Sequence, residues 1–258
     1  MAPKRKLLFV AAHPDDAEFC AGGLISAWSE VGHLVKILCL TNGNAGHHKT
    51  PPDELAKRRA EEAKSSADII GAELEIWDQP DGELTPSVEL RKKLIGCIRS
   101  FAPDLIVTHR VADYHPDHRA TGQLVQDSAY LLQVPAIEPN FPAMRQMPAI
   151  LLAYDRFQDP RPHRLDWVID IAAQLETVLE MLTCHQTQVF EWLPRIMGKT
   201  VNAENRQIWL REFYSAKPEA VAKLARKNSG IADLAFAEGF EVSEYGGRFN
   251  SADFNFLN

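Results

Sequence analysis

Short apolar runs alternate with longer segments of helical pattern through the first half of the chain. The apolar runs predict strands at Leu7–Ala12, Val35–Leu40, Leu74–Trp77 and Leu105–Thr108. The segments that follow them predict helices at Ala17–Val31, Asp53–Ile70, Ser87–Phe101 and Arg119–Leu132. The strand runs lack polar alternation, which is typical of strands covered on both faces. Repeated strand–helix units with right-handed crossovers therefore predict an α/β fold, a doubly wound and mostly parallel sheet with helices on both faces.

The second half of the chain is less regular. Gln133–Pro148 is rich in proline and is interpreted as an ordered loop. Beyond it, the pattern predicts strands at Ala149–Tyr154 and Trp167–Asp170, and helices from Ile171 to about Cys184, at Glu204–Tyr214 and at Pro218–Phe240. The tail after Glu241 receives no assignment. The 258 residues fit one α/β domain with a C-terminal helical extension.

Composition narrows the class of partner. The net charge of −7 disfavours nucleic acid, because phosphate binding needs clustered Lys and Arg. No apolar run approaches membrane-spanning length, and the basic start Met1–Lys6 lacks the features of a signal peptide. The four cysteines are far apart and form no Cys-x-x-Cys pair, which indicates reduced thiols in a cytoplasmic protein.

Two short motifs carry the candidate chemistry. His13-Pro-Asp-Asp16 directly follows the first predicted strand, and His115-Pro-Asp-His118 follows the fourth. With the common strand order 3-2-1-4, both motifs border the crevice where doubly wound sheets bind ligands. Catalytic zinc takes three protein ligands of this kind and keeps one position open for water. The two motifs together therefore predict the metal site of a hydrolase.

The motifs suggest a division of roles. A metal bound by His13, Asp16 and His118 leaves Asp15 free as a general base and His115 as a donor to a developing oxyanion. The spacing leaves the ligand choice open, because binding by His115 as well would close the shell and give a structural site. Two His and one carboxylate also bind Fe(II) in oxygenases, and a sugar-binding module with an inactive site is a further alternative.

The two motifs resemble those of a known family, the PIG-L (LmbE-like) zinc deacetylases. Ala12-His-Pro-Asp-Asp16 and Tyr114-His-Pro-Asp-His-Arg119 are similar to its two signatures. Four further similarities follow in the family's order: Arg59-x-x-Glu62, Asp170-Ile171, His185-Gln-Thr-Gln188 and Ala237-Glu-Gly-Phe240. The amino-acid sequence of the second signature is close to that of diacetylchitobiose-type deacetylases.

The resemblance implies a Rossmann-like fold and removal of an N-acetyl group from N-acetylglucosamine or a derivative. It implies one Zn²⁺ per chain, replaceable by other divalent metals, bound by His13, Asp16 and His118. Asp15 would be the general base and His115 the oxyanion partner. Asp117 would orient His115, and Arg59 would contact the amino-sugar substrate. The family's trimers and hexamers imply a homo-oligomer.

An amidase that cleaves a larger amide conjugate is the alternative within hydrolases. Residues 1–258 are expected to form one domain, in which 1–135 form the core with the metal site and 136–258 complete the substrate cleft. The segments 133–148 and 191–205 are expected to shape specificity. The roles of Tyr114, His185 and Gln188 are unassigned, and the position of a tyrosine that is catalytic in some relatives is taken by Asp113.

Overall fold

A computed structural model describes residues 4–229 and 233–257. Within these residues, one seven-stranded sheet has the order β3-β2-β1-β4-β5-β7-β6. The strands are β1 Lys6–Ala11, β2 Leu34–Cys39, β3 Glu73–Ile76, β4 Leu105–Thr108, β5 Ala149–Ala153, β6 Trp167–Asp170 and β7 Ala237–Val242. The first five run parallel, and β7 pairs antiparallel with both β5 and β6. The predicted α/β, mostly parallel sheet is confirmed.

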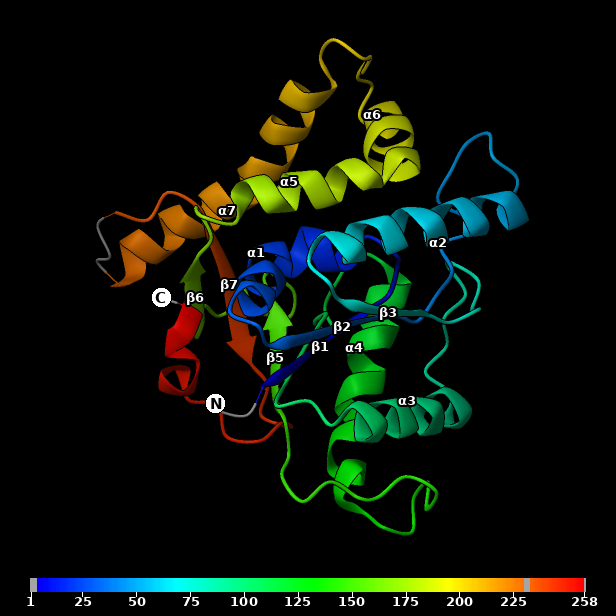
Figure 1. The fold of residues 1–258 in the computed structure, drawn as a ribbon, viewed down its shortest axis with the longest axis vertical. Helices are drawn as coiled ribbons and strands as arrows, with labels where there is room; N and C mark the ends of the chain where they lie inside the picture. The colour runs from blue at the N-terminus through cyan, green and yellow to red at the C-terminus, as the bar shows by residue number, and fades with distance from the viewer. Residues whose placement is uncertain (1–3, 230–232, 258) are drawn as a thin grey trace.

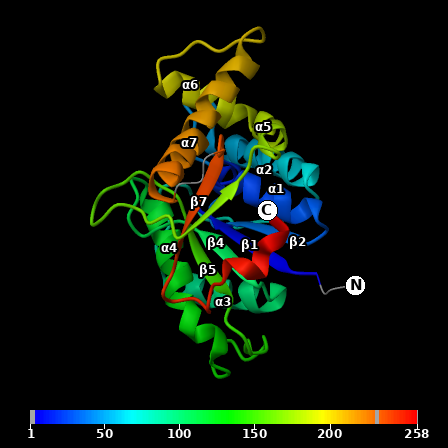
Figure 2. The ribbon, with the colours of Figure 1, turned by 90° about the vertical axis from the view of Figure 1, so that its left-hand side faces the viewer.

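Helices cover both faces of this sheet (Figures 1 and 2). One face carries α1 Asp16–Glu30, α2 Pro52–Ile69 and α5 Leu175–Cys184, and the other carries α3 Val88–Phe101 and α4 Pro116–Ala129. A 3₁₀ turn at Tyr130–Gln133 extends α4. A π-helix at Gln186–Trp192 leads from α5 into the short α6 at Leu193–Ile196. The chain continues through α7 at Arg206–Ser229 and ends in a 3₁₀ segment at Ser251–Leu257.

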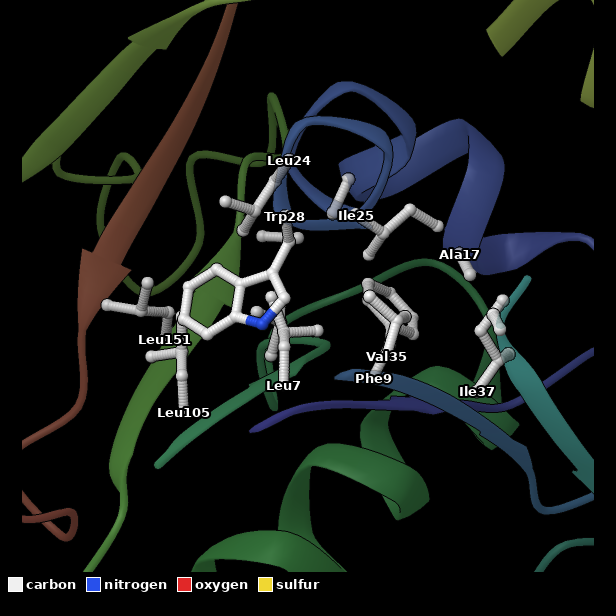
Figure 3. Packing of buried hydrophobic residues seen from close by; sticks show 14 of the residues in the cluster. Leu7, Phe9, Ala17, Leu24, Ile25, Trp28, Val35, Ile37, Leu105 and Leu151 are labelled. Atoms are coloured by element: carbon white, nitrogen blue, oxygen red, sulfur yellow. The ribbon is translucent and has the colours of Figure 1, made fainter. Parts of the chain in front are cut away.

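The apolar strand residues fill two cores, one on each face. Leu7 and Phe9 of β1 point toward α1, where Trp28 packs over them, as Figure 3 shows. Leu8 and Val10, the alternate residues of the same strand, belong to the core under α3 and α4. All four side chains are fully buried. Burial of each such side chain stabilises the fold by roughly 1.5–3 kcal/mol, which explains the absence of polar alternation in β1.

The C-terminal prediction is partly wrong. The two helices expected at Glu204–Tyr214 and Pro218–Phe240 are one helix, α7, with Pro218 inside it. Residues 237–240 form the start of β7 instead, and residues 230–232 lie outside the described part. Phe240 explains this outcome, because in the strand it is fully buried and packs on Trp167 at a ring distance of 5.6 Å. The helix expected from Arg119 begins three residues earlier, at Pro116.

Every helix in the described part of the chain is too short or too polar to span a lipid bilayer.

Candidate metal centre

The two motifs meet at the carboxyl edge of the sheet. β1 and β4 are parallel neighbours, with Val10 opposite Thr108, so the loops that leave them run side by side. The predicted order 3-2-1-4 is confirmed by the sheet. Parallel pairing therefore brings together two segments that are about a hundred residues apart in sequence.

A tight turn shapes the first motif. The backbone N–H of His13 donates to Asp16 Oδ2 at 2.7 Å, and the N–H of Asp16 donates to the carbonyl of His13 at 3.3 Å. Because this turn uses Pro14 and Asp15, α1 begins at Asp16, one residue before the predicted start at Ala17. His13 and Asp16 are both buried.

The second motif opens α4 in the expected way. Pro116 is its first residue, where a missing N–H costs nothing. His115 caps the helix, since its Nδ1 accepts the backbone N–H of Asp117 at 3.2 Å. That bond leaves the proton of the neutral ring on Nε2, which can act as a donor. His118 lies in the first helical turn and is buried.

Donor atoms of three side chains lie close together between the motifs. His118 Nε2 lies 3.3 Å from His13 Nδ1 and 3.3 Å from Asp16 Oδ1, and His13 Nδ1 lies 3.5 Å from Asp16 Oδ2. Tetrahedral zinc with bonds of about 2.0–2.1 Å holds its ligands about 3.3–3.4 Å apart. The separations between these side chains therefore suit one zinc ion.

Carboxylates hold the other nitrogen of each histidine. His13 Nε2 lies 3.1 Å from Asp81 Oδ1 and 3.3 Å from Asp117 Oδ2. His118 Nδ1 lies 3.1 Å from Asp113 Oδ1. Metal-binding histidines usually donate their second N–H to such groups, which fix the ring and raise its basicity. Both histidines are therefore oriented as metal ligands are.

His109 gives a competing ligand set. Directly after β4, its Nε2 lies 3.1 Å from Asp16 Oδ2, and its ring stacks on His118 at 4.1 Å. Among the described residues, three groups of donors lie close enough together to hold a metal ion: His13 with His115 and His118, Asp16 with His109 and His118, and His13 with Asp81 and Asp117. The predicted set of His13, Asp16 and His118 shares two members with each of the first two groups but is not itself one of the three. Sequence reasoning missed His109 and Asp81, although each also follows the carboxyl end of a strand.

The acids and imidazoles packed around His118 and His13 change the pKa values of these two histidines. Burial lowers the pKa of His118, but the charge of Asp16 and the hydrogen bond to Asp113 outweigh it and raise that pKa to about 9. Burial also disfavours a charged His13, yet hydrogen bonds to Asp117, Asp16 and Asp81 raise its pKa well above the ordinary value. Without a metal, protonated imidazoles therefore balance the carboxylates. A divalent cation can replace those protons in the same place.

Asp15 has a different partner from its neighbour Asp16. Arg59 Nη2 donates to Asp15 Oδ1 at 2.8 Å, and Arg59 Nη1 donates to the carbonyl of Gly43 at 3.0 Å. Gly43 is necessary here, because a Cβ at this position would lie 2.4 Å from the guanidinium, and its φ of 67° suits glycine. Arg59 is 3% exposed, so it meets the cleft only at its tip.

The carboxylate of Asp117 does not contact His115, the side chain that Asp117 was expected to orient. Its carboxylate accepts the backbone N–H groups of Gly82 and Leu84 at 2.7 and 3.1 Å and faces His13. Asp117 therefore meets His115 through its backbone N–H, not through its carboxylate. The reason is the start of α4 at Pro116, which turns the Asp117 side chain toward β1 and leaves only its backbone N–H for His115.

A buried network explains the motif after α5. His185 Nε2 lies 3.1 Å from Glu18 Oε1, and Glu62 accepts both the N–H and the hydroxyl of Thr187 at 3.0 and 2.6 Å. These contacts tie the start of the π-helix to α1 and α2. They also place Gln188, whose amide donates to the carbonyl of Gly46 at 2.9 Å, on the wall of the cleft.

The side chains of the candidate metal centre line one cleft of about 1630 Å³. Its floor includes the two motifs, Arg59, Asp81 and His109. Its outer part is formed by residues from 153–157 and from 192–220. The expected division into a core at 1–135 and a cleft-completing part at 136–258 stays a prediction.

Known proteins resemble the chain over the site and beyond it. Residues 8–129 match the family model described as PIG-L, GlcNAc-PI de-N-acetylase. Diacetylchitobiose deacetylase from Thermococcus kodakarensis is 29% identical over 190 residues, which are 71% of this chain and 70% of that protein. A 4-oxalmesaconate hydratase from Pseudomonas putida is 23% identical over 250 residues, 93% of this chain and 89% of that protein.

A solved structure shares the fold. N,N'-diacetylchitobiose deacetylase from Pyrococcus horikoshii superimposes with a TM-score of 0.76 and 24% identity, covering 93% of this chain and 84% of that one. At this identity the likeness concerns the fold alone.

Proposed function

We propose that the protein is a member of the PIG-L family of deacetylases, a zinc-dependent hydrolase that removes the N-acetyl group of an N-acetylglucosamine-type amino sugar. The observation that carries the proposal is the position of His118 Nε2, which lies 3.3 Å from both His13 Nδ1 and Asp16 Oδ1, while the other Asp16 oxygen, Oδ2, lies 3.5 Å from His13 Nδ1. One zinc ion per chain fits this donor set.

Zinc bound there would act as a Lewis acid toward the acetyl carbonyl and lower the pKa of water. Asp15 faces the same cleft and serves as general base, with Arg59 fixing its carboxylate. His115 donates through Nε2 to the oxyanion that develops at the carbonyl. Burial and the charges of His13 and His118 lower the pKa of His115, so its neutral form donates near pH 7.

The carboxylates outside the ligand set have a positioning role in this proposal. Asp117 and Asp81 hold the second nitrogen of His13, and Asp113 holds that of His118. Asp113 stands where some relatives have a catalytic tyrosine. Tyr114 beside it is 71% exposed at the cleft and has no assigned step.

Water addition to an unsaturated oxo acid is a second candidate function. The observation in its favour is the match to 4-oxalmesaconate hydratase along 93% of this chain, against 71% for the T. kodakarensis deacetylase. Identity is 29% over the shorter match to the deacetylase and 23% over the longer match to the hydratase, and the family model that matches residues 8–129 is that of a de-N-acetylase, which favours deacetylation.

Two product assays separate these functions. Zinc-loaded protein is incubated with the methyl β-glycoside of N-acetylglucosamine, and acetate and free amine are measured. The same protein is incubated with 4-oxalmesaconate, and hydration is followed as loss of absorbance by the conjugated double bond. The proposal predicts equimolar acetate and amine in the first assay and no turnover in the second; the reverse pattern would establish the hydratase.

A further inference from the structure

The outer part of the cleft has a continuous apolar wall. It is formed by the π-helix, α6 and the first half of α7, which project beyond α5 on the side of the sheet away from α3 and α4 (Figure 1). We define the apolar wall by the cleft-lining residues Trp192, Leu193, Ile196, Met197, Ile208, Trp209 and Phe213.

Aromatic rings connect the apolar wall to the candidate metal centre. Trp209 and Phe213 are one helical turn apart on α7 and stack at a centroid distance of 5.0 Å and an interplanar angle of 8°. Phe213 meets Phe19 edge to face at 6.0 Å. Phe19 lies three residues after Asp16 in α1 and lines the same cleft. The wall is therefore continuous with the floor that holds the reacting groups.

The wall exposes large aliphatic side chains to the cleft. Ile208 is 63% exposed, Ile196 56% and Met197 47%. Clustered exposed apolar groups beside a polar site indicate a binding surface. These side chains form no hydrogen bonds, so sugar hydroxyls packed on them would lose partners at a free-energy cost. The chemistry of this surface therefore suits a hydrocarbon group.

The size of the cleft supports a ligand with two unlike parts. Pockets for small ligands usually have volumes of about 300–1,000 Å³, and this cleft reaches about 1630 Å³. One acetamido sugar held between Asp15, Arg59 and His115 leaves the apolar wall uncovered.

We propose that the apolar wall binds a bulky hydrocarbon or aromatic group attached to the amino sugar, so that the substrate is an acetamido sugar with an apolar aglycone. This inference rests on the proposed function for the identity of the sugar, whereas the recognition of the apolar group is a binding property. It can therefore be measured without turnover.

The test compares two ligands that share the sugar. Zinc-loaded full-length protein is titrated calorimetrically with the 2-naphthyl and the methyl β-glycoside of N-acetylglucosamine, and acetate release is measured with both. We expect the naphthyl glycoside to bind at least about tenfold more tightly, since burial of an aromatic group is worth more than one methylene. If acetate release exists, its kcat/KM should follow the same order.

A double variant assigns the preference to the wall. In Ile196→Ser/Ile208→Ser, the naphthyl advantage should fall about three- to tenfold while affinity for the methyl glycoside is unchanged. Both side chains are exposed, so the fold should tolerate the change. The matched control is Val88→Ser, which removes a 58% exposed aliphatic side chain from α3, on the other face of the sheet.

Three results would overturn the inference. Equal binding of both glycosides by the wild type shows that the wall has no ligand role, whether or not acetate is released. Tighter binding of di-N-acetylchitobiose than of the naphthyl glycoside shows that a second sugar occupies it. A change of oligomeric state in the double variant, with the naphthyl preference intact, shows that the wall is covered by another copy of the chain. Absence of acetate release with the naphthyl preference present contradicts the proposed function alone.

Discussion

Two adjacent carboxylates at the end of β1 have unlike surroundings. Asp15 occupies the N-cap position of α1 without a side-chain capping bond, and its carboxylate is held by the guanidinium of Arg59. Asp16 accepts from the backbone of His13 and faces the imidazoles of His118 and His109. Burial alone would raise the pKa of Asp16, but the charges of His118 and His109 hold that pKa well below its ordinary value. This contrast supports a base at Asp15 and a ligand at Asp16.

Amide substitutions of the two carboxylates should therefore have different effects. Asp15→Asn should keep its zinc and lose about 10²–10⁴ in kcat, because a positioned base is removed. Asp16→Asn should instead bind zinc at least about tenfold more weakly, since a neutral amide replaces an anionic ligand. Zinc content after dialysis and kcat at saturating zinc measure both. Loss of zinc only from Asp15→Asn would reverse the two roles.

Arg59 offers a second comparison at this scale. Arg59→Ala removes the partner of Asp15, so kcat/KM for the acetamido sugar should fall about 10–100-fold with zinc content unchanged, because a misplaced catalytic group is costly. Arg58 is the matched control, since its guanidinium pairs with Glu191 at 2.8 Å and is partly exposed. Arg58→Ala should retain the wild-type kcat/KM. An equal loss in both variants would indicate a general effect of charge.

The sequence allowed prediction of the motif residues but not of all their neighbours. His13, Asp16 and His118 stood out because each motif repeats the same groups after a strand. His109, Asp81 and Asp113 lie in no repeated pattern, and their contacts depend on strand register and on the turn before α1. The contact of the Asp117 carboxylate with His13 was missed for the same reason, since one turn of α4 decides which histidine this carboxylate meets.

Among the elements, β7 connects the parallel part of the sheet to its antiparallel edge. Glu238 in this strand accepts the backbone N–H groups of Gly23 and Leu24 at 2.8 and 2.9 Å, where α1 departs from helical geometry at Ala21. Glu241 accepts two hydrogen bonds from Arg161, at 2.8 and 2.5 Å. The strand is thus fixed by ionic and backbone contacts as well as by Phe240.

Glu241 provides a pH-dependent test of this edge. Burial opposes its charge, but Arg161 and the backbone N–H of Arg164 lower its pKa from 4.5 to about 2. A carboxyl group with a lowered pKa stabilises the fold above pH 4.5, and this contribution is lost as the pH falls toward 2. Because both arginines are partly exposed, we expect Glu241→Gln to cost about 1–2 kcal/mol at pH 7.

Urea unfolding between pH 7 and pH 3 measures this contribution. The difference between wild type and Glu241→Gln should be constant down to about pH 4.5 and shrink below it. Glu176→Gln is the control, since the pair of Glu176 with Arg211 lies on the surface and should be worth less than about 1 kcal/mol. A difference that grows on acidification would contradict the assignment.

β7 is also the element that the sequence pattern predicted wrongly. Residues 237–242, Ala-Glu-Gly-Phe-Glu-Val, include two acids and a glycine and lack the apolar continuity of β1. Their buried acids are satisfied by α1 and by Arg161, partners that are distant in sequence. The apolar runs Leu7–Ala11 of β1 and Leu105–Val107 of β4 need no such partners, because their side chains pack in the apolar cores on the two faces of the sheet.

At the scale of the whole molecule, two parts of the chain form one cleft. The metal centre belongs to residues before 135, and the apolar wall belongs to residues after 186. The network of Glu18 with His185 and of Glu62 with Thr187 holds these parts together. The candidate metal centre and the apolar wall are thus far apart in the sequence but line the same cleft.

Titration of the metal-free protein with zinc tests the central claim most directly. The protein is stripped with a chelator, and acetate release from the methyl β-glycoside of N-acetylglucosamine is measured as zinc is added back. The account predicts no release without metal and a linear rise that ends at about one zinc per chain, because His13, Asp16 and His118 form one site. Acetate release that survives removal of the metal, or that fails to appear with one zinc bound per chain, would contradict it.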